Sequence, residues 1–266
     1  MRAKTPLYGK TFFKKFPSPQ ILTTPIIYYT KRKSVKTKTF VNVVANVVIV
    51  AMVATVGIIT LSGTTVGAFV NKENTPVYRG NSTEGVSLMI NVYWGTEYID
   101  GMLEILERYD CKATFFIGGC WAVKYPEVLG KIVEKGHELG NHGYFHKHHS
   151  KLTTEQNTTE ITSCEKVVWQ LTGVRTELFA PPSGDFDKKT LAACEALGYR
   201  TIMWSRDTID WRDKSADIVY ERATKNTKPG ELILMHPTQH TLQALEKIVQ
   251  YYKEHNIKLI TVGENI

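Results

Sequence analysis

The hydrophobic positions divide this chain into a long apolar segment near the N-terminus and a region where short apolar runs alternate with amphipathic stretches. No charged residue occurs from Thr39 to Asn71, and the densest apolar run covers residues 40–61. A helix over this run would be about 33 Å long, enough to cross a hydrocarbon core of about 30 Å. The pattern therefore predicts one transmembrane helix at residues 40–61.

The region from residue 85 to 266 has the alternating pattern of a β/α domain. Short apolar runs predict strands at Val86–Asn91, Lys112–Ile117, Glu138–Asn141, Glu177–Ala180, Arg200–Met203, Leu232–Met235 and Lys258–Val262. Amphipathic stretches predict helices at Glu97–Tyr109, Pro126–Lys135, Thr153–Leu171, 187–197, 215–226 and 239–254, and Thr153 with Gln156 has the spacing of a capping box. This order predicts a parallel sheet covered by helices, either an open doubly wound sheet or a small incomplete barrel. In both, reactive side chains gather at the carboxyl ends of the strands.

Charge separates the two regions further. Residues 1–71 contain ten Lys or Arg and no Asp or Glu, so the rest of the chain holds 23 basic and 26 acidic residues. The domain at 85–266 therefore has no basic excess, which argues against a nucleic-acid partner. Because the basic residues precede the apolar run, the positive-inside rule predicts a cytoplasmic tail at 1–39 and a domain outside the cell membrane, with residues 40–61 in contact with the lipid bilayer.

A cleaved signal peptide is the alternative interpretation of the N-terminal region. Val66, Gly67 and Ala68 loosely fit a cleavage site, but the basic region and the apolar run are both longer than a signal peptide needs. An uncleaved anchor is favoured for this reason. The small and polar residues at 62–84 predict a linker between the anchor and the domain.

The four cysteines do not indicate a structural zinc site, because none of them forms a CxxC pair. Each lies beside apolar residues, which predicts buried free thiols, although the compartment would permit a disulfide. The cysteines are Cys111, Cys120, Cys164 and Cys194.

Four short motifs follow predicted strands. HGYFH places His142 and His146 four residues apart, so a helical turn would direct both imidazoles towards one metal, whereas a solvated His-rich loop is the alternative. FAPPSG at 179–184 fits a rigid turn, and DTIDW at 207–211 puts two carboxylates beside a tryptophan. The apolar strand LILM is followed directly by His236, and the carboxyl end of a strand is a position suited to catalysis.

In this order, the motifs HGYFH, FAPPSG, DTIDW and LMH resemble four of the five motifs of the NodB-type polysaccharide deacetylases, carbohydrate esterase family four. The resemblance covers residues 86–266 and includes the connecting stretches KATFFIGG, GHELGNH and LTGV. The segment NVYWGTEY resembles a divergent, sporulation-associated branch of the family. The resemblance implies a deformed (β/α)7 barrel that deacetylates N-acetyl sugars of cell-wall polysaccharide such as peptidoglycan, with a divalent metal, usually zinc.

The resemblance also implies roles for individual residues. His142 and His146 match the metal ligands, His236 matches the catalytic acid, and Asp210 matches the carboxylate that supports this acid. The positions that line the substrate groove are matched by Pro182, Trp211 and Leu234.

The first motif departs from the family pattern. Asn91 stands at the position of the general base, Val92 at the position of the metal-binding Asp, and Ala180 at the position of the Arg that orients the base. An amide has no basic lone pair, and a valine cannot bind a metal. A catalytic zinc normally has three protein ligands, so a replacement would have to come from Tyr93, Glu97 or Asp185.

Two hypotheses for function follow. The first is a metal-dependent hydrolase that deacetylates cell-wall polysaccharide with a degenerate first motif and zinc as its cofactor. The alternative is a catalytically weak or inactive protein of the same fold that binds N-acetylated glycan and needs no metal, because Val92 replaces the metal-binding Asp.

Overall fold

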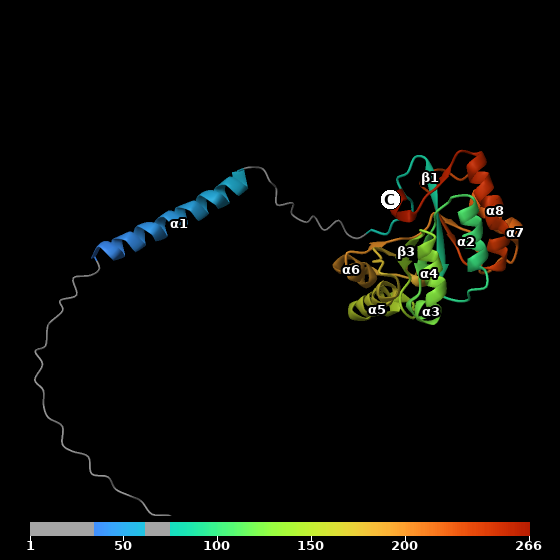
Figure 1. Ribbon diagram of the computed structural model, residues 1–266, viewed down its shortest axis with the longest axis horizontal. Coiled ribbons are helices and arrows are strands. Elements are labelled where there is room, and N and C mark those ends of the chain that lie inside the picture. Colours follow the sequence, from blue (N-terminus) through green and yellow to red (C-terminus); the bar gives the residue numbers. More distant parts are fainter. Residues whose placement is uncertain (1–34, 62–74) are drawn as a thin grey trace, which may run out of the picture. The chain divides into compact units, whose positions relative to one another are not determined.

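The computed structural model describes residues 35–61 and 75–266, with side chains described at 40–54 and 75–266 (Figure 1). The chain divides into two compact units after Ala68. In the first unit, helix α1 spans Val35–Leu61, and its apolar side chains from Phe40 to Val53 are exposed. Within the described residues, none of the helices has both the length and the apolar character that a membrane crossing requires. The predicted span at 40–61 continues past residue 54, and its remaining side chains lie outside the described residues, as do most of the predicted tail and linker.

The second unit is built on one sheet of eight strands that are all paired in parallel. Its order is β5-β4-β3-β2-β1-β7-β6, with β8 paired to β1. The strands are β1 (Gly85–Val92), β2 (Thr114–Ile117), β3 (Glu138–Asn141), β4 (Leu178–Phe179), β5 (Arg200–Thr201), β6 (Arg206–Asp207), β7 (Leu232–Met235) and β8 (Lys258–Leu259). No pairing joins β5 to β6 among the described residues, so the barrel is open on that side. The predicted parallel β/α architecture is confirmed.

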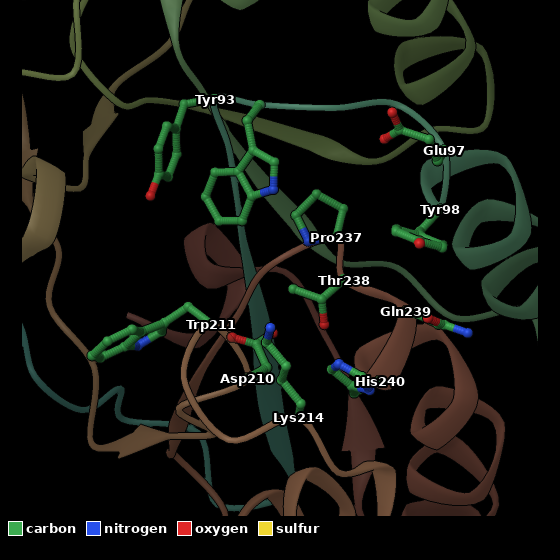
Figure 2. Close-up of a pocket in the computed structure, with 11 residues that line it drawn as sticks. Tyr93, Glu97, Tyr98, Asp210, Trp211, Lys214, Pro237, Thr238, Gln239 and His240 are labelled. Carbon is green, nitrogen blue, oxygen red and sulfur yellow. The ribbon is translucent and has the colours of Figure 1, made fainter.

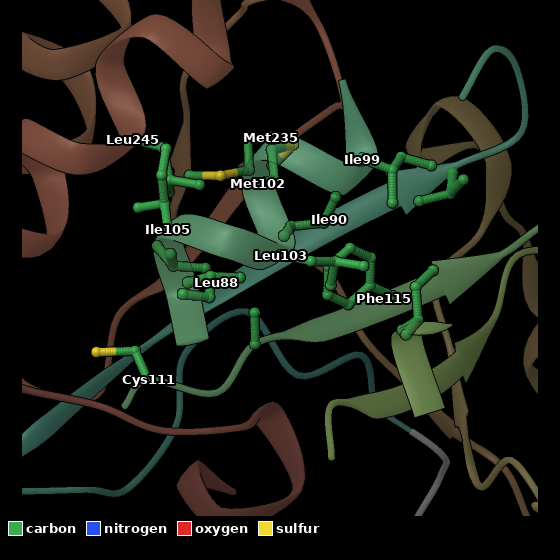
Figure 3. Close-up of a cluster of buried hydrophobic side chains, with 14 of the residues drawn as sticks. Leu88, Ile90, Ile99, Met102, Leu103, Ile105, Cys111, Phe115, Met235 and Leu245 are labelled. Carbon is green, nitrogen blue, oxygen red and sulfur yellow. The ribbon is translucent and has the colours of Figure 1, made fainter. Parts of the chain in front are cut away.

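The side chains of the central strand β1 alternate between two surroundings, and only those on one side of the strand can reach the site. All eight of its residues are buried. Leu88 and Ile90 pack against helix α2 (Ile99–Arg108) in the larger hydrophobic cluster, as Figure 3 shows. Because side chains alternate along a strand, Met89 and Asn91 point the other way, towards the barrel interior. Asn91 therefore lies at the interior, carboxyl end of the strand.

The helices cover the outside of the sheet, close to their predicted positions. Besides α2 they are α3 (Gly119–Lys124), α4 (Pro126–Glu134), α5 (Thr154–Thr172), α6 (Lys188–Ala196), α7 (Ala216–Thr224) and α8 (Gln239–Glu254). The short helix α9 (Val262–Asn265) instead packs Val262 in a smaller hydrophobic cluster with Met89, on the interior side of β1. The predicted capping box at Thr153 is confirmed, since its side chain accepts from Gln156 N while Gln156 Oε1 accepts from Thr153 N. The sequence patterns missed α3, α9 and β6, each too short to show a periodicity.

Two further features differ from the expected ones or extend them. Cys120 is exposed, which corrects the expectation that all four cysteines are buried; the other three are buried, and all four are free thiols. Val77 and Arg79, in the segment expected as a linker, form bridges to Ile202 and Glu231. The Arg79 guanidinium also lies 3.3 Å from the Glu231 carboxylate, so this part of the segment joins the domain.

Candidate active site

A cavity of about 330 Å³ opens at the carboxyl ends of the central strands, where the sequence placed the site. It is lined by Asn91, Tyr93, His142, His146, Ser183, Gly184, Trp204, Asp207, Trp211, Leu234 and His236. Six of the eight residues singled out from the sequence therefore surround one space. The other two, Asp210 and Pro182, are buried just behind this lining.

His236 and Asp210 form a rigid pair at the end of β7. Asp210 Oδ1 lies 2.8 Å from His236 Nδ1, and Asp210 Oδ2 accepts from the backbone N of His236 at 2.6 Å. The hydroxyl of Thr241, in the first turn of α8, also donates to Asp210 Oδ2. The carboxylate is 2% exposed, so these three donors satisfy a charge that solvent cannot reach. The pair fixes the ring so that Nε2 is the free edge of His236.

His142 is held in an equally defined orientation. Its Nδ1 lies 2.7 Å from the carbonyl oxygen of Ala180, which can only accept, so Nδ1 carries the proton. Its Nε2 is buried and has no hydrogen-bond partner. Burial lowers the pKa of His142 well below its usual value, and the neighbouring His146 lowers it further. The ring is therefore neutral, with an unused lone pair on Nε2.

His146 lies beside His142, but the segment between them is not helical. The backbone of His146 has a φ of 54°, and the two ring centroids are 5.0 Å apart. The helical turn considered for HGYFH is thus wrong, although the loop still brings both imidazoles to one cavity. Burial lowers the pKa of His146 to about 4. Tyr93 stacks on its ring with centroids 3.5 Å apart and planes 18° apart.

The two departures in the first motif have different places in the structure. Asn91 lines the cavity, is 3% exposed, and its Oδ1 has no hydrogen-bond partner. Val92 is fully buried in the larger hydrophobic cluster with Ile99 and Trp121. Neither an amide nor a packed valine can replace the carboxylates of the family pattern.

The three side chains considered as a replacement metal ligand are engaged elsewhere. Asp185 accepts from the backbone N and the hydroxyl of Ser150 at 2.9 and 2.8 Å. Glu97 accepts from the backbone N of Thr96 and lines a neighbouring cleft, while Tyr93 lies flat on His146. In the part of the chain that the structure describes, no group of three His, Cys, Asp or Glu side chains is arranged to hold a metal ion. The donor set thus does not fit the zinc site that the resemblance implies.

Of the three residues expected to line the substrate groove, two line the cavity and the third lies beneath it. Trp211 and Leu234 line the cavity, and Trp211 is 56% exposed. Pro182 is buried beneath it, and the next two residues of the same turn line the space. Trp204 also lines the cavity and was not among the residues singled out from the sequence, although its place directly after a predicted strand could have identified it.

A wider cleft of about 670 Å³ adjoins this cavity and shares Tyr93 and Trp211 with it. Figure 2 shows Trp211 and Lys214 on one side of the cleft, with Glu97 and Tyr98 on the other. Trp94 also lines the cleft and stacks on His236 with ring centroids 5.3 Å apart. Exposed tryptophans beside polar side chains are a surface on which sugar rings can stack.

Comparison with known proteins places this geometry in a family context. The profile of a family described as polysaccharide deacetylase matches residues 79–202. Protein YlxY of Bacillus subtilis is 38% identical over 190 residues, which are 71% of this chain and 60% of that protein. A peptidoglycan-N-acetylglucosamine deacetylase of Bacillus cereus is 30% identical over 171 residues, 62% of each chain. The chain thus spans about 60% of the length of these two relatives.

Among solved structures, a CE4 family pseudoenzyme from Bacillus anthracis superposes with a TM-score of 0.70 and 35% identity. The match covers 72% of this chain and 69% of that one. A mutant of the same pseudoenzyme, with restored enzymatic activity, matches with the same TM-score at 33% identity, over 72% of this chain and 71% of the mutant. These similarities confirm the deformed (β/α)7 barrel.

Proposed function

This chain belongs to the polysaccharide deacetylase family, carbohydrate esterase family four, and we propose that its domain at 85–266 binds amino-sugar glycan of the cell wall without metal-dependent turnover. The observation that carries the proposal is the missing metal set. His142 and His146 line the cavity and His236 is paired with Asp210, but among the described residues no three His, Cys, Asp or Glu side chains are arranged to hold a metal ion. With two protein ligands, a zinc ion lacks the coordination that activates water in hydrolases.

The missing general base points in the same direction. Asn91 lines the cavity, but its amide cannot take a proton from water. General-base assistance contributes about 10² to 10⁴ in rate, so its loss together with that of the metal removes most of the catalytic effect. Residues expected to contact the sugar are present, since Trp211 and Leu234 line an open cavity. The peptidoglycan deacetylase among the relatives supports peptidoglycan, a glycan built of amino sugars, as the class of ligand.

One observation favours the second candidate, a deacetylase with weak activity. His236 and Asp210 retain the geometry of an acid and its supporting carboxylate, at 2.8 Å. Such a pair could protonate a leaving amine if another group activated the water. The experiment must therefore separate binding from turnover.

The test uses the full-length chain purified in a mild detergent. Sedimentation with purified peptidoglycan measures binding, release of acetate from an N-acetylglucosamine oligomer measures turnover, and elemental analysis measures bound metal. We expect co-sedimentation with no acetate above background and no bound metal. Acetate release that disappears in His236→Ala would replace the binding function with the hydrolase, and failure to sediment with glycan would remove the binding function.

We also propose that residues 40–61 tether this domain to the outer face of a cell membrane, with residues 1–39 in the cytoplasm. The support is the absence of charge from residue 39 to 71 and the position of all ten N-terminal basic residues before the apolar run. Alkaline carbonate extraction of cell membranes should leave the chain in the pellet, and protease added to intact cells lacking their wall should digest the domain. Release into the carbonate supernatant, or protection from the protease, would contradict this location.

A further inference from the structure

The polar atoms at the cavity are arranged to accept hydrogen bonds. Asn91 Oδ1 and His142 Nε2 are both buried without a partner. The Nδ1 of His142 donates to the Ala180 carbonyl, so Nε2 of the neutral ring can only accept. Beside them, His236 Nδ1 is directed at Asp210 Oδ1, so Nε2 is its remaining ring nitrogen and is an acceptor when the ring is neutral. Three acceptors therefore surround a space of about 330 Å³.

The charge around the cavity has one sign. Asp207 lines the space, and the carboxylate of Asp210 lies directly behind His236. The described residues that line it include no Lys or Arg. Asp210 is buried and Asp207 is half-buried, and carboxylates in such a surrounding attract a cation because less water is present to screen them.

The walls add aromatic faces to this charge. Tyr93, Trp204 and Trp211 all line the cavity. The faces of such rings attract cations and also stack on sugars. A ligand that combines a sugar ring with a positive group thus fits the cavity better than a neutral sugar does.

We propose that this cavity selects de-N-acetylated amino-sugar units over N-acetylated ones. The inference rests on the proposed function, glycan binding by this domain, and names the ligand of the same site. A protonated amine offers three donors and a positive charge to the acceptors at Asn91, His142 and His236. An acetamide offers a single N–H and no positive charge to the same acceptors. The chain would then recognise glycan that a hydrolytic deacetylase has already modified.

The test compares two sugars by calorimetric titration of the full-length chain, in the presence of a chelator and slightly below neutral pH. A glucosamine tetramer is expected to bind about tenfold more tightly than an N-acetylglucosamine tetramer, as a charge-assisted hydrogen bond would produce. Asn91→Leu, which removes an acceptor at similar volume, should reduce this ratio to below about threefold. The matched control Asn81→Leu, an exposed position outside the cavity, should leave the ratio unchanged.

Each other outcome is decisive. Equal or tighter binding of the acetylated tetramer overturns the inference and leaves glycan binding intact, whereas binding of neither tetramer overturns both. A glucosamine affinity that requires added zinc would show that the acceptors serve a metal, and so overturns the inference. Equal affinity for a lysine tetramer would assign the preference to net charge instead of the cavity, with the same consequence.

Discussion

The phenol ring of Tyr93 lies flat on the imidazole of His146, with ring centroids 3.5 Å apart. The contact covers one face of a side chain that the family pattern assigns to the metal. Tyr93 directly follows Asn91 and Val92, so the segment that lacks the two carboxylates of the family pattern also supplies the ring that covers His146.

Removal of this ring should change the protonation of the histidine it covers. Burial holds the pKa of His146 at about 4, and Tyr93 contributes to that burial. In Tyr93→Ala we expect the pKa to rise towards the ordinary value of about 6.5, because water can reach the ring. An NMR titration of the imidazole resonances measures it. Tyr78→Ala, an exposed position, is the matched control, and an unchanged pKa in Tyr93→Ala would show that other residues bury the ring.

The sequence was sufficient for the fold because the strands and the longer helices carry strong periodic patterns. The gathering of His142, Asp210 and His236 in one place was also predictable, since they follow strands whose carboxyl ends meet. What could not be predicted depends on side-chain conformation. Tyr93 stacks on His146, whose backbone has a φ of 54°, and the pattern HGYFH reveals neither feature. The engagement of Asp185 with Ser150 likewise links residues far apart in sequence.

Acid should destabilise this domain through its buried histidines. Burial lowers the pKa of His137 to about 4, below its value of about 6.5 in the unfolded chain. The unfolded state thus binds more protons between these values, so the free energy of unfolding falls as pH falls from about 6.5 to 4 and is fully retained above that window. The slope from one such group is at most about 1.4 kcal/mol per pH unit. Denaturant unfolding at a series of pH values measures the slope.

His137→Gln should reduce this slope, because it removes one of the groups whose pKa differs between the two states. The matched control is His255→Gln at an exposed position, where the slope should be unchanged even if the overall stability shifts. The same slope in wild type and His137→Gln would contradict the assignment. A residual slope in His137→Gln is expected, since burial also lowers the pKa of His142 and His146.

Asp210 is expected to support the domain as well as the site. In Asp210→Asn the three donors that now bind the carboxylate, including Thr241 Oγ1 and His236 N, meet a neutral group with one acceptor oxygen. The loss should cost about 1.5–3 kcal/mol of unfolding free energy, the range for a buried hydrogen bond to a charged group. Asp217→Asn, at an exposed position, should change it by less than about 0.5 kcal/mol. Denaturant unfolding compares the two, and equal effects would contradict a special role for Asp210.

Val92 is the residue whose replacement should return a metal to the site. Val92 is packed in the larger hydrophobic cluster and does not line the cavity, so in Val92→Asp the end of β1 would have to turn the new carboxylate towards His142 and His146 to give the three protein ligands that a catalytic zinc needs. The cost of leaving an unpaired charge in an apolar cluster favours that turn. We expect stoichiometric zinc by elemental analysis, where Val92→Asn, of the same shape but without the charge, takes up none. Adding Asn91→Asp to Val92→Asp should then raise acetate release by about 10² to 10⁴, the contribution of a general base. Zinc uptake by the wild-type chain equal to that of Val92→Asp would instead show that the two histidines already suffice, and the proposed absence of turnover would lose its physical basis.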